Sequence, residues 1–120
     1  MSRPHPATNV CVLAGTVHRA PEVRTLRSGE QVAHLEVRVA PPDGPAEVVP
    51  VAVADPSTAV RELAPGTPVV LQGRVRRRFF RTGGATQSRT EVAATAVVPA
   101  RRRAQARRLL DAAAANLAAS

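Results

Sequence analysis

The chain of 120 residues contains no lysine, tryptophan or tyrosine, and Cys11 is its only cysteine. A single cysteine excludes an internal disulfide, and its apolar strand context predicts a small buried side chain. No apolar run approaches the roughly 20 residues that a membrane span requires. The segment Met1–Pro6 is polar and proline-rich, unlike a signal peptide. We therefore expect a cytoplasmic protein with no membrane partner.

The residue patterns of catalytic and metal sites are also missing. His5, His18 and His34 have no ligand-like spacing, and one cysteine cannot form a zinc pattern. No Ser/His/Asp constellation or pair of carboxylates is present, and Gly83-Gly84 is too short to cradle a phosphate. We expect no enzymatic activity, no metal, no cofactor and no small-molecule substrate.

Aromatic side chains are scarce, with Phe79 and Phe80 the only two. Hydrophobic residues make up 44% of the chain, and most of them are Val, Ala and Leu. The length fits a single domain, and a core of small side chains buries little apolar surface. We expect a modestly stable monomer or a stabilising homo-oligomer.

Arginine is what the chain has in excess. All 17 basic residues are Arg, and with 9 acidic residues the formal net charge is +8. A positive field of this size concentrates polyanionic partners. Guanidinium groups hydrogen-bond to phosphate and stack on bases, although a GC-rich genome would also favour arginine over lysine. The net charge therefore points to nucleic acid.

Five Val-rich segments have the composition and alternation of β-strands, and we expect them over residues 9–18, 31–40, 47–54, 68–81 and 88–98. The segment 19–30 is turn-rich, and Pro50 indicates an edge or bulge position. Asp55 as N-cap, Pro56 at the first helical position and a stop at Pro65-Gly66 predict one short helix. Three strands, a short helix and a two-stranded hairpin is the order of an all-β, five-stranded OB barrel.

The composition shifts after Pro99 to an Ala-rich segment with five arginines. Leu109, Leu110, Ala113 and Leu117 fall on one helical face, which predicts a short amphipathic helix. Arg101–Arg103 at its start oppose the helix dipole, which favours fraying or a bound anion. We divide the chain into a flexible N-terminus (1–7), an OB-fold domain (8–99) and an Arg/Ala-rich helix or tail (100–120).

The strongest local signal is the segment Arg74–Arg81, RVRRRFFR. In an extended strand Arg74, Arg76, Arg78 and Phe80 share one face. Guanidinium groups beside an aromatic ring provide phosphate contacts and a stacking platform, as sequence-tolerant binding of a single nucleic-acid strand requires. The alternative is a solvated basic hairpin with one buried Phe. The residues that we expect to complete this face are Arg81, Arg24, Arg27 and Arg38.

Several segments in order resemble the bacterial single-stranded DNA-binding protein family over roughly residues 8–98: Asn9–Val17, Pro21–Arg24, Ser28-Gly29, Val32-Ala33, Gly73–Phe80 and Glu91–Ala93. The resemblance implies an OB barrel that assembles as a homotetramer, with a dimer possible, and that coats single-stranded DNA during replication, repair and recombination in the nucleoid. It places Phe80 where the family has a base-stacking aromatic. By the same resemblance, Arg76 and Arg78 fall at strand positions that contact the DNA backbone in that family.

The chain departs from this family in three respects. The further stacking aromatics of the second and third strands are missing, and Glu47 and Val53 stand near the third strand instead. The loop Pro41–Pro45 is short, and an Arg/Ala tail replaces the acidic C-terminal tip. Each missing stack removes about 1–3 kcal/mol, which electrostatics has to offset. We therefore expect a divergent or accessory paralogue.

Two other functions remain open from the sequence. One is an OB-fold interaction or assembly subunit with little or no binding of single-stranded DNA, and the scarce aromatics and the Leu-bearing tail favour it. The other is a basic RNA-binding OB protein, because no residue that would recognise a 2′-hydroxyl can be read from the sequence. An exposed Phe80 face that continues into Arg24, Arg27 or Arg38 would favour DNA binding. A Phe80 buried in a subunit contact would favour assembly.

Overall fold

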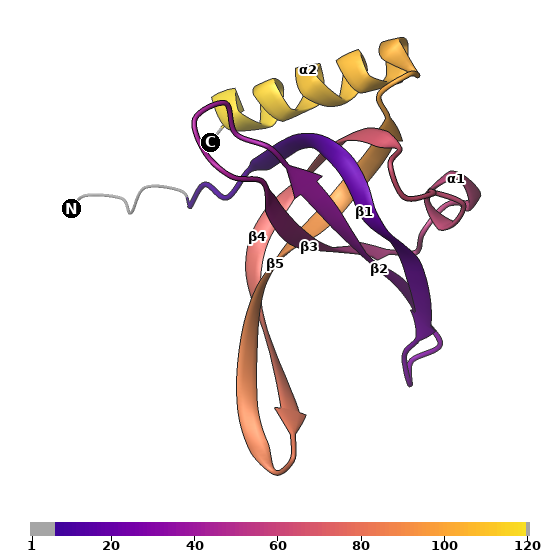
Figure 1. Ribbon diagram of the computed structural model, residues 1–120, viewed down its shortest axis with the longest axis vertical. Helices are drawn as coiled ribbons and strands as arrows, with labels where there is room; N and C mark the ends of the chain where they lie inside the picture. The colour runs from indigo at the N-terminus through magenta and orange to yellow at the C-terminus, as the bar shows by residue number, and fades with distance from the viewer. Residues whose placement is uncertain (1–6, 120) are drawn as a thin grey trace, which may run out of the picture.

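The computed structural model describes residues 7–119, so nearly all of the expected flexible N-terminus (1–7) lies outside the described residues. Its elements, in chain order, are β1 (Cys11–Thr25), β2 (Gln31–Val39), β3 (Glu47–Ala54), α1 (Thr58–Arg61), β4 (Pro68–Thr82), β5 (Ala85–Pro99) and α2 (Arg103–Ala119). The strands close into a barrel in the order β1-β2-β3-β5-β4 (Figure 1). This closed barrel, with one short helix between the third and fourth strands, is the OB fold that the sequence predicts.

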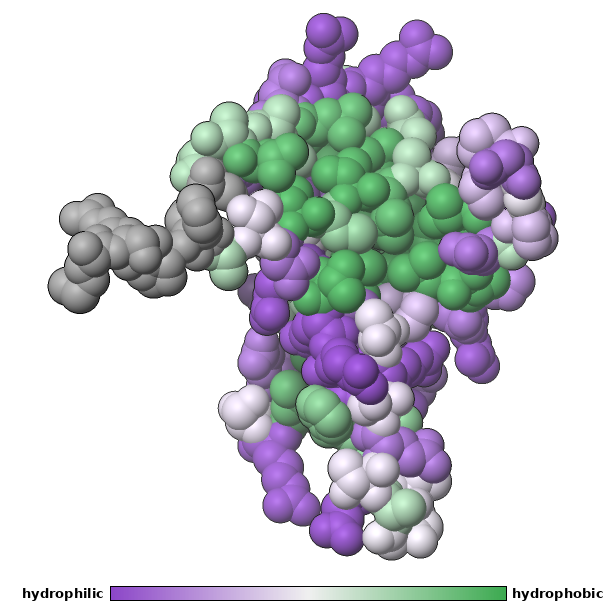
Figure 2. Space-filling view, turned by 90° about the vertical axis from the view of Figure 1, so that its left-hand side faces the viewer, coloured by the Kyte–Doolittle hydropathy of each residue, from purple (hydrophilic) through white to green (hydrophobic). Residues whose placement is uncertain are grey.

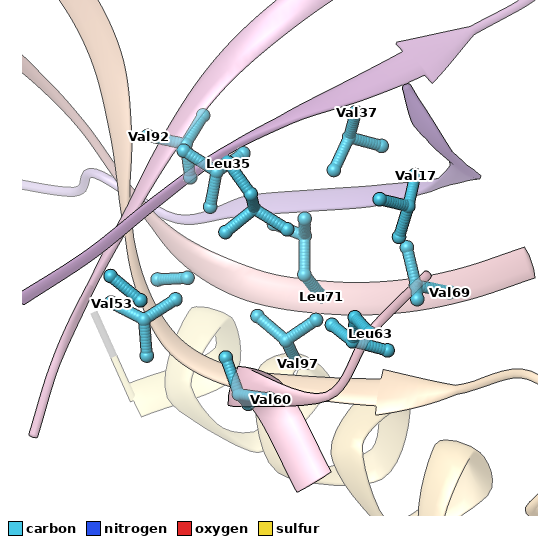
Figure 3. Close-up of a cluster of buried hydrophobic side chains, with 13 residues drawn as sticks. Val17, Leu35, Val37, Val53, Val60, Leu63, Val69, Leu71, Val92 and Val97 are labelled. Carbon is cyan, nitrogen blue, oxygen red and sulfur yellow. The ribbon is translucent and has the colours of Figure 1, made fainter. Parts of the chain in front are cut away.

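The barrel core follows from alternation along the strands. In β2 the side chains of Ala33, Leu35 and Val37 are buried, while the residues between them are not. They meet small apolar side chains from every other strand and from α1 (Figure 3). Cys11 is half-buried against this core, where burial raises the pKa of its thiol. Among the described residues this core cluster contains no aromatic ring, because both phenylalanines lie on the β4–β5 hairpin.

The first strand is longer than the sequence predicts, because the segment 19–25 belongs to β1 rather than to a turn. It pairs with β2, with register shifts on both sides of Arg19. Pro21 lies within the second shift, between Arg19 and Glu22, so its missing N–H removes no regular ladder hydrogen bond. The turn itself is Leu26–Glu30, closed by the Leu26 N–H donating to the Glu30 carbonyl at 2.8 Å.

The third strand has the predicted bounds, and Pro50 lies at the end of its unpaired edge. β3 pairs along its whole length with β2, but its parallel pairing with β5 covers only Val51–Val53. Pro50 directly precedes that segment, so its ring disturbs no hydrogen bond to β5.

The short helix starts later than predicted. Its N-cap is Ser57, whose hydroxyl accepts a hydrogen bond from the Val60 N–H at 3.3 Å. The expected cap, Asp55, instead has a left-handed φ of 48° and donates its N–H to the Gln31 carbonyl at 2.8 Å. Asp55 therefore turns the chain out of β3, and Ser57, two residues on, is better placed to cap α1.

The β4–β5 hairpin projects well beyond the barrel (Figure 1). Gly83 and Gly84 form its two-residue turn with φ values of 58° and 81°, which glycine adopts without strain. At its base the register shifts between Gln72 and Gly73. A Cβ atom at Gly73 would collide with the backbone of Ala93 and Ala94, so this close approach requires glycine.

The C-terminal helix packs against β4 and β5 through Ala106, Leu109 and Ala113. Leu110 and Leu117, expected on the buried face, are exposed. The buried stripe is thus rotated towards the alanines, whose small side chains allow a close approach to the barrel. Within residues 7–119 no helix is long and apolar enough to cross a membrane.

Candidate nucleic-acid interface

The hairpin carries two different faces, which its cross-strand register defines. On one, Arg76 lies opposite Glu91, Arg78 opposite Arg89, and Phe80 opposite Gln87. We call these six residues the Phe80 face. On the other, alternation places Arg77, Phe79 and Arg81, opposite Thr90, Ser88 and Thr86. The predicted grouping of Arg76, Arg78 and Phe80 agrees with this arrangement, whereas Arg81 points away from it.

Glu91 holds two arginines of the Phe80 face. Its side chain is only 2% exposed. Arg76 donates from Nη2 and Nε to Oε2 at 2.8 and 3.1 Å. Arg78 Nε lies 3.1 Å from Oε1 but is a buried donor without hydrogen-bond geometry. One carboxylate thus fixes two guanidinium groups and leaves the three residues with a formal charge of +1.

The two phenylalanines differ in their surroundings. The Arg78 guanidinium lies over the Phe80 ring, 5.6 Å from its centre, a distance at which a cation–π attraction operates. Phe80 is half-buried beside it. Phe79, which the sequence analysis left unassigned, is 68% exposed on the opposite face. Each hairpin face therefore presents one aromatic ring among arginines.

A pocket of about 160 Å³ lies beside the Phe80 face. Arg78, Arg89 and Glu91 line it from the hairpin, and the remaining wall comes from β1, β2 and β3. Two weaker ion pairs stand there, Arg19 with Glu36 at 3.7 Å and Arg24 with Glu22 at 3.4 Å. The predicted Arg24 thus lines the pocket beside the Phe80 face, as do Arg19 and Arg89, which the sequence analysis missed.

His34 also lines this pocket. Partial burial, followed by the positive charge of Arg78, lowers the pKa of its imidazole below its usual value. Glu91 opposes that shift but does not cancel it. Burial and the neighbouring arginines thus both disfavour the charged imidazole, and the same arginines offer a positive environment to a phosphate.

The other predicted residues lie further away. Arg74 is exposed on β4, opposite Ala93; alternation places it on the same face as Arg76, as predicted, but further from Phe80. Arg27 belongs to the turn after β1. Arg38 is exposed near the end of β2, paired with Thr16, which in turn pairs with Pro68 at the start of β4. Arg38 therefore lies towards the end of the barrel opposite the hairpin.

One signal in the sequence could have identified the missed hairpin residues. The two-residue turn Gly83-Gly84 fixes the hairpin register. Counting outward from it gives the cross-strand pairs Arg78 with Arg89 and Arg76 with Glu91. Arg19 could not be found this way, because its place depends on the irregular register of β1.

Within residues 7–119 no group of His, Cys, Asp or Glu side chains could hold a metal ion.

A closed OB barrel with an arginine- and phenylalanine-bearing hairpin defines a class of proteins that bind single-stranded nucleic acid. The model of the single-strand binding protein family matches residues 8–99, and the chain belongs to this family. Its members bind nucleic acid and are not enzymes. Membership of this family therefore confirms the prediction that the chain has no enzymatic activity. A search of curated proteins finds no match.

Proposed function

We propose that this protein coats single-stranded DNA through the Phe80 face, with little dependence on base sequence. The observation that carries the proposal is the placement of Arg78 between the Glu91 carboxylate and the Phe80 ring. A fixed guanidinium beside a ring offers a phosphate contact and a stacking surface to one nucleotide. Stacking on a ring requires an unpaired base, which favours single strands over duplex.

Electrostatics supplements the few aromatic rings. The Phe80 face and its pocket contain five arginines and three carboxylates, which leaves a formal charge of +2: Arg19, Arg24, Arg76, Arg78 and Arg89 against Glu22, Glu36 and Glu91. If the five arginines each engage a phosphate, log affinity falls with log salt at a slope near −3.5, at about −0.7 per phosphate. Binding is therefore strongly salt-dependent.

Fluorescence anisotropy of a labelled dT30 strand tests this function. A matched duplex and an RNA strand are measured alongside, each at two salt concentrations. We expect salt-sensitive binding that prefers the single DNA strand. Equal weak binding to all three would indicate a generic basic surface, preference for RNA would support the RNA-binding alternative, and absence of binding near physiological salt would sink the proposal.

The two adjacent phenylalanines provide a matched pair of variants. Phe80→Ala should weaken dT30 binding by about 1–3 kcal/mol, or roughly 5- to 150-fold in Kd. Phe79→Ala removes the same ring from the opposite face and should leave Kd nearly unchanged. A larger loss for Phe79→Ala would assign the DNA to the other side of the hairpin.

We also propose that the protein works as a homo-oligomer, as a tetramer by family resemblance or as a dimer. On the outside of the barrel, Val12 is 40% exposed, and Figure 2 shows a broad hydrophobic area above the hydrophilic hairpin. Among the described residues, the first half of β1, Cys11–Gly15, pairs with β4 on one side and with no strand on the other. A second copy would cover both features.

A further inference from the structure

The net positive charge is concentrated in two separate segments. Residues 74–91 contain six arginines and one glutamate, a formal charge of +5. Residues 101–111 contain five arginines and one aspartate, a formal charge of +4. The rest of the chain holds six arginines and seven acidic residues, a formal charge of −1. The positive field of the protein therefore comes almost entirely from the hairpin and from the start of α2.

These two segments lie at opposite ends of the molecule. Figure 1 shows α2 across one end of the barrel and the hairpin tip at the other, along the longest axis, whose extent is 46 Å. Arg38 lies near the α2 end of the barrel. It pairs with Thr16, which pairs with Pro68, and the Pro68 carbonyl accepts a hydrogen bond from the Ala100 N–H just before α2. One of the predicted site residues thus sits closer to α2 than to Phe80.

The arginines of the α2 segment are exposed and unpaired. We call them the α2 arginine surface: Arg101, Arg102, Arg103, Arg107 and Arg108. Their side chains form no hydrogen bond or ion pair with another residue of the described chain. The only carboxylate in the adjoining groove beside α1 is that of Glu62. In the pocket of the Phe80 face, by contrast, three carboxylates stand among the arginines.

The α2 arginine surface is also held in place. Ala106 and Leu109, on either side of Arg107 and Arg108, are buried against the barrel, which turns these guanidinium groups outward. Arg102, which precedes α2, is held by backbone hydrogen bonds to Pro99 and Ala106. A buried anchor between exposed charges makes this a fixed surface rather than a loose tail. It carries no aromatic ring, so it offers phosphate contacts without base stacking.

We propose that the α2 arginine surface is a second phosphate-binding site for the same DNA strand that occupies the Phe80 face. The inference rests on the proposed function and extends it. The strand leaves the hairpin, crosses the weakly charged barrel and reaches α2. Binding affinity therefore depends on strand length, because a stacked strand of about six nucleotides, at about 3.4 Å each, covers less than half of the 46 Å longest axis.

The test compares dT6 and dT30 on the wild-type chain and on the triple variant R101A/R102A/R103A, by fluorescence anisotropy across a salt series. With dT30 the variant should bind at least about tenfold more weakly, with a salt slope less steep by about 2, since three phosphate contacts contribute about 0.7 each. With dT6 wild type and variant should bind alike. Alanine favours helix, and circular dichroism checks that α2 is retained.

The matched control is R101K/R102K/R103K, which keeps the charge and should keep the wild-type slope. Unchanged dT30 binding by the alanine variant would overturn the second site alone. An equal loss for both strands would show a general field effect and also overturn it. A matched duplex is measured alongside, and a loss of duplex binding with unchanged dT30 binding would overturn the second site and reassign the surface to double-stranded DNA. Failure of the wild-type protein to bind either strand would refute the proposed function, and the second site with it.

Discussion

Among single residues, Glu91 orients arginines of the Phe80 face, although its negative charge would be expected to repel phosphate. It is a buried carboxylate at the centre of a surface proposed to bind phosphate, yet it orients two guanidinium groups. Arg76 and Arg78 keep further N–H groups for a ligand, because each guanidinium has five donors. Glu91 therefore lowers the positive charge of the Phe80 face by one unit and, in the same contacts, fixes the orientation of two guanidinium groups.

Replacing Glu91 with Gln separates these two effects. The variant should unfold more easily by about 1–2 kcal/mol, since charge-assisted hydrogen bonds are lost and the partly exposed arginines turn to solvent. The salt slope of dT30 binding should become steeper, because the local charge rises by one. Urea denaturation and anisotropy measure the two quantities. Weaker binding at low salt would show that orientation matters more than charge.

His34 should make stability depend on pH. Its pKa is lower in the folded chain than the ordinary 6.5, so the unfolded chain takes up a proton first as pH falls. The free energy of unfolding should be highest above that value, decrease below it and level off below the folded-state pKa. The charged groups facing His34 are Arg19, Glu22 and Arg24 on β1, Glu36 on β2, Arg76 and Arg78 on β4, and Arg89 and Glu91 on β5.

Thermal unfolding of the free protein across this pH range measures the effect. The variant His34→Gln should flatten the profile, whereas His18→Gln, which changes an exposed histidine of β1, serves as the matched control. An unchanged profile in His34→Gln would assign the pH dependence to other groups.

For the strands, the sharpest test concerns the bulge at the base of the hairpin. Gly73→Ala would push a methyl group into the backbone of β5 and should destabilise the barrel by about 1–3 kcal/mol. Gly44→Ala, in a loop where the new methyl meets only the Pro41 ring at 3.8 Å, should change stability by less than about 0.5 kcal/mol. Equal effects in thermal unfolding would contradict a special packing role for Gly73.

The elements that sequence predicts best are those whose burial follows local alternation. β2 has nearly the expected bounds because one of its faces is apolar and buried. β3 has the expected bounds because its Val-rich run ends at Asp55, although Val51–Val53 are all buried rather than alternating. The sequence analysis predicted too short a first strand, because Pro21 is typical of a turn. In the structure a register shift accommodates Pro21 within β1. Leu110 is likewise exposed although the sequence predicts it on the buried face, because which side of α2 is buried depends on how the helix packs against the barrel.

The candidate site divides along similar lines. Period-two alternation predicts that Arg76, Arg78 and Phe80 share a face, and the register places them together. The neutralising role of Glu91 depends on a contact between residues 15 positions apart, which alternation alone does not reveal. The pocket wall with Arg19 needs the closed barrel, because all five strands contribute residues to it.

At the scale of the whole molecule, self-association should depend on the outer face of β1. Val12→Asp places a charge on that face without disturbing the core, so the monomer should remain folded while the oligomer dissociates. Light scattering coupled to size-exclusion chromatography measures the mass. Leu26→Asp, a similarly exposed site in the turn after β1, is the matched control. An unchanged mass in Val12→Asp would place the interface elsewhere.

The two phenylalanines of this chain are consecutive residues of β4, and their rings lie on opposite sides of the hairpin. The protein thus carries its own pair of spectroscopic reporters. In a proton or carbon NMR spectrum, every phenylalanine ring resonance comes from the hairpin, and no tryptophan or tyrosine signal overlaps it. Titration with unlabelled DNA would therefore show, from which ring shifts, the side from which a strand arrives.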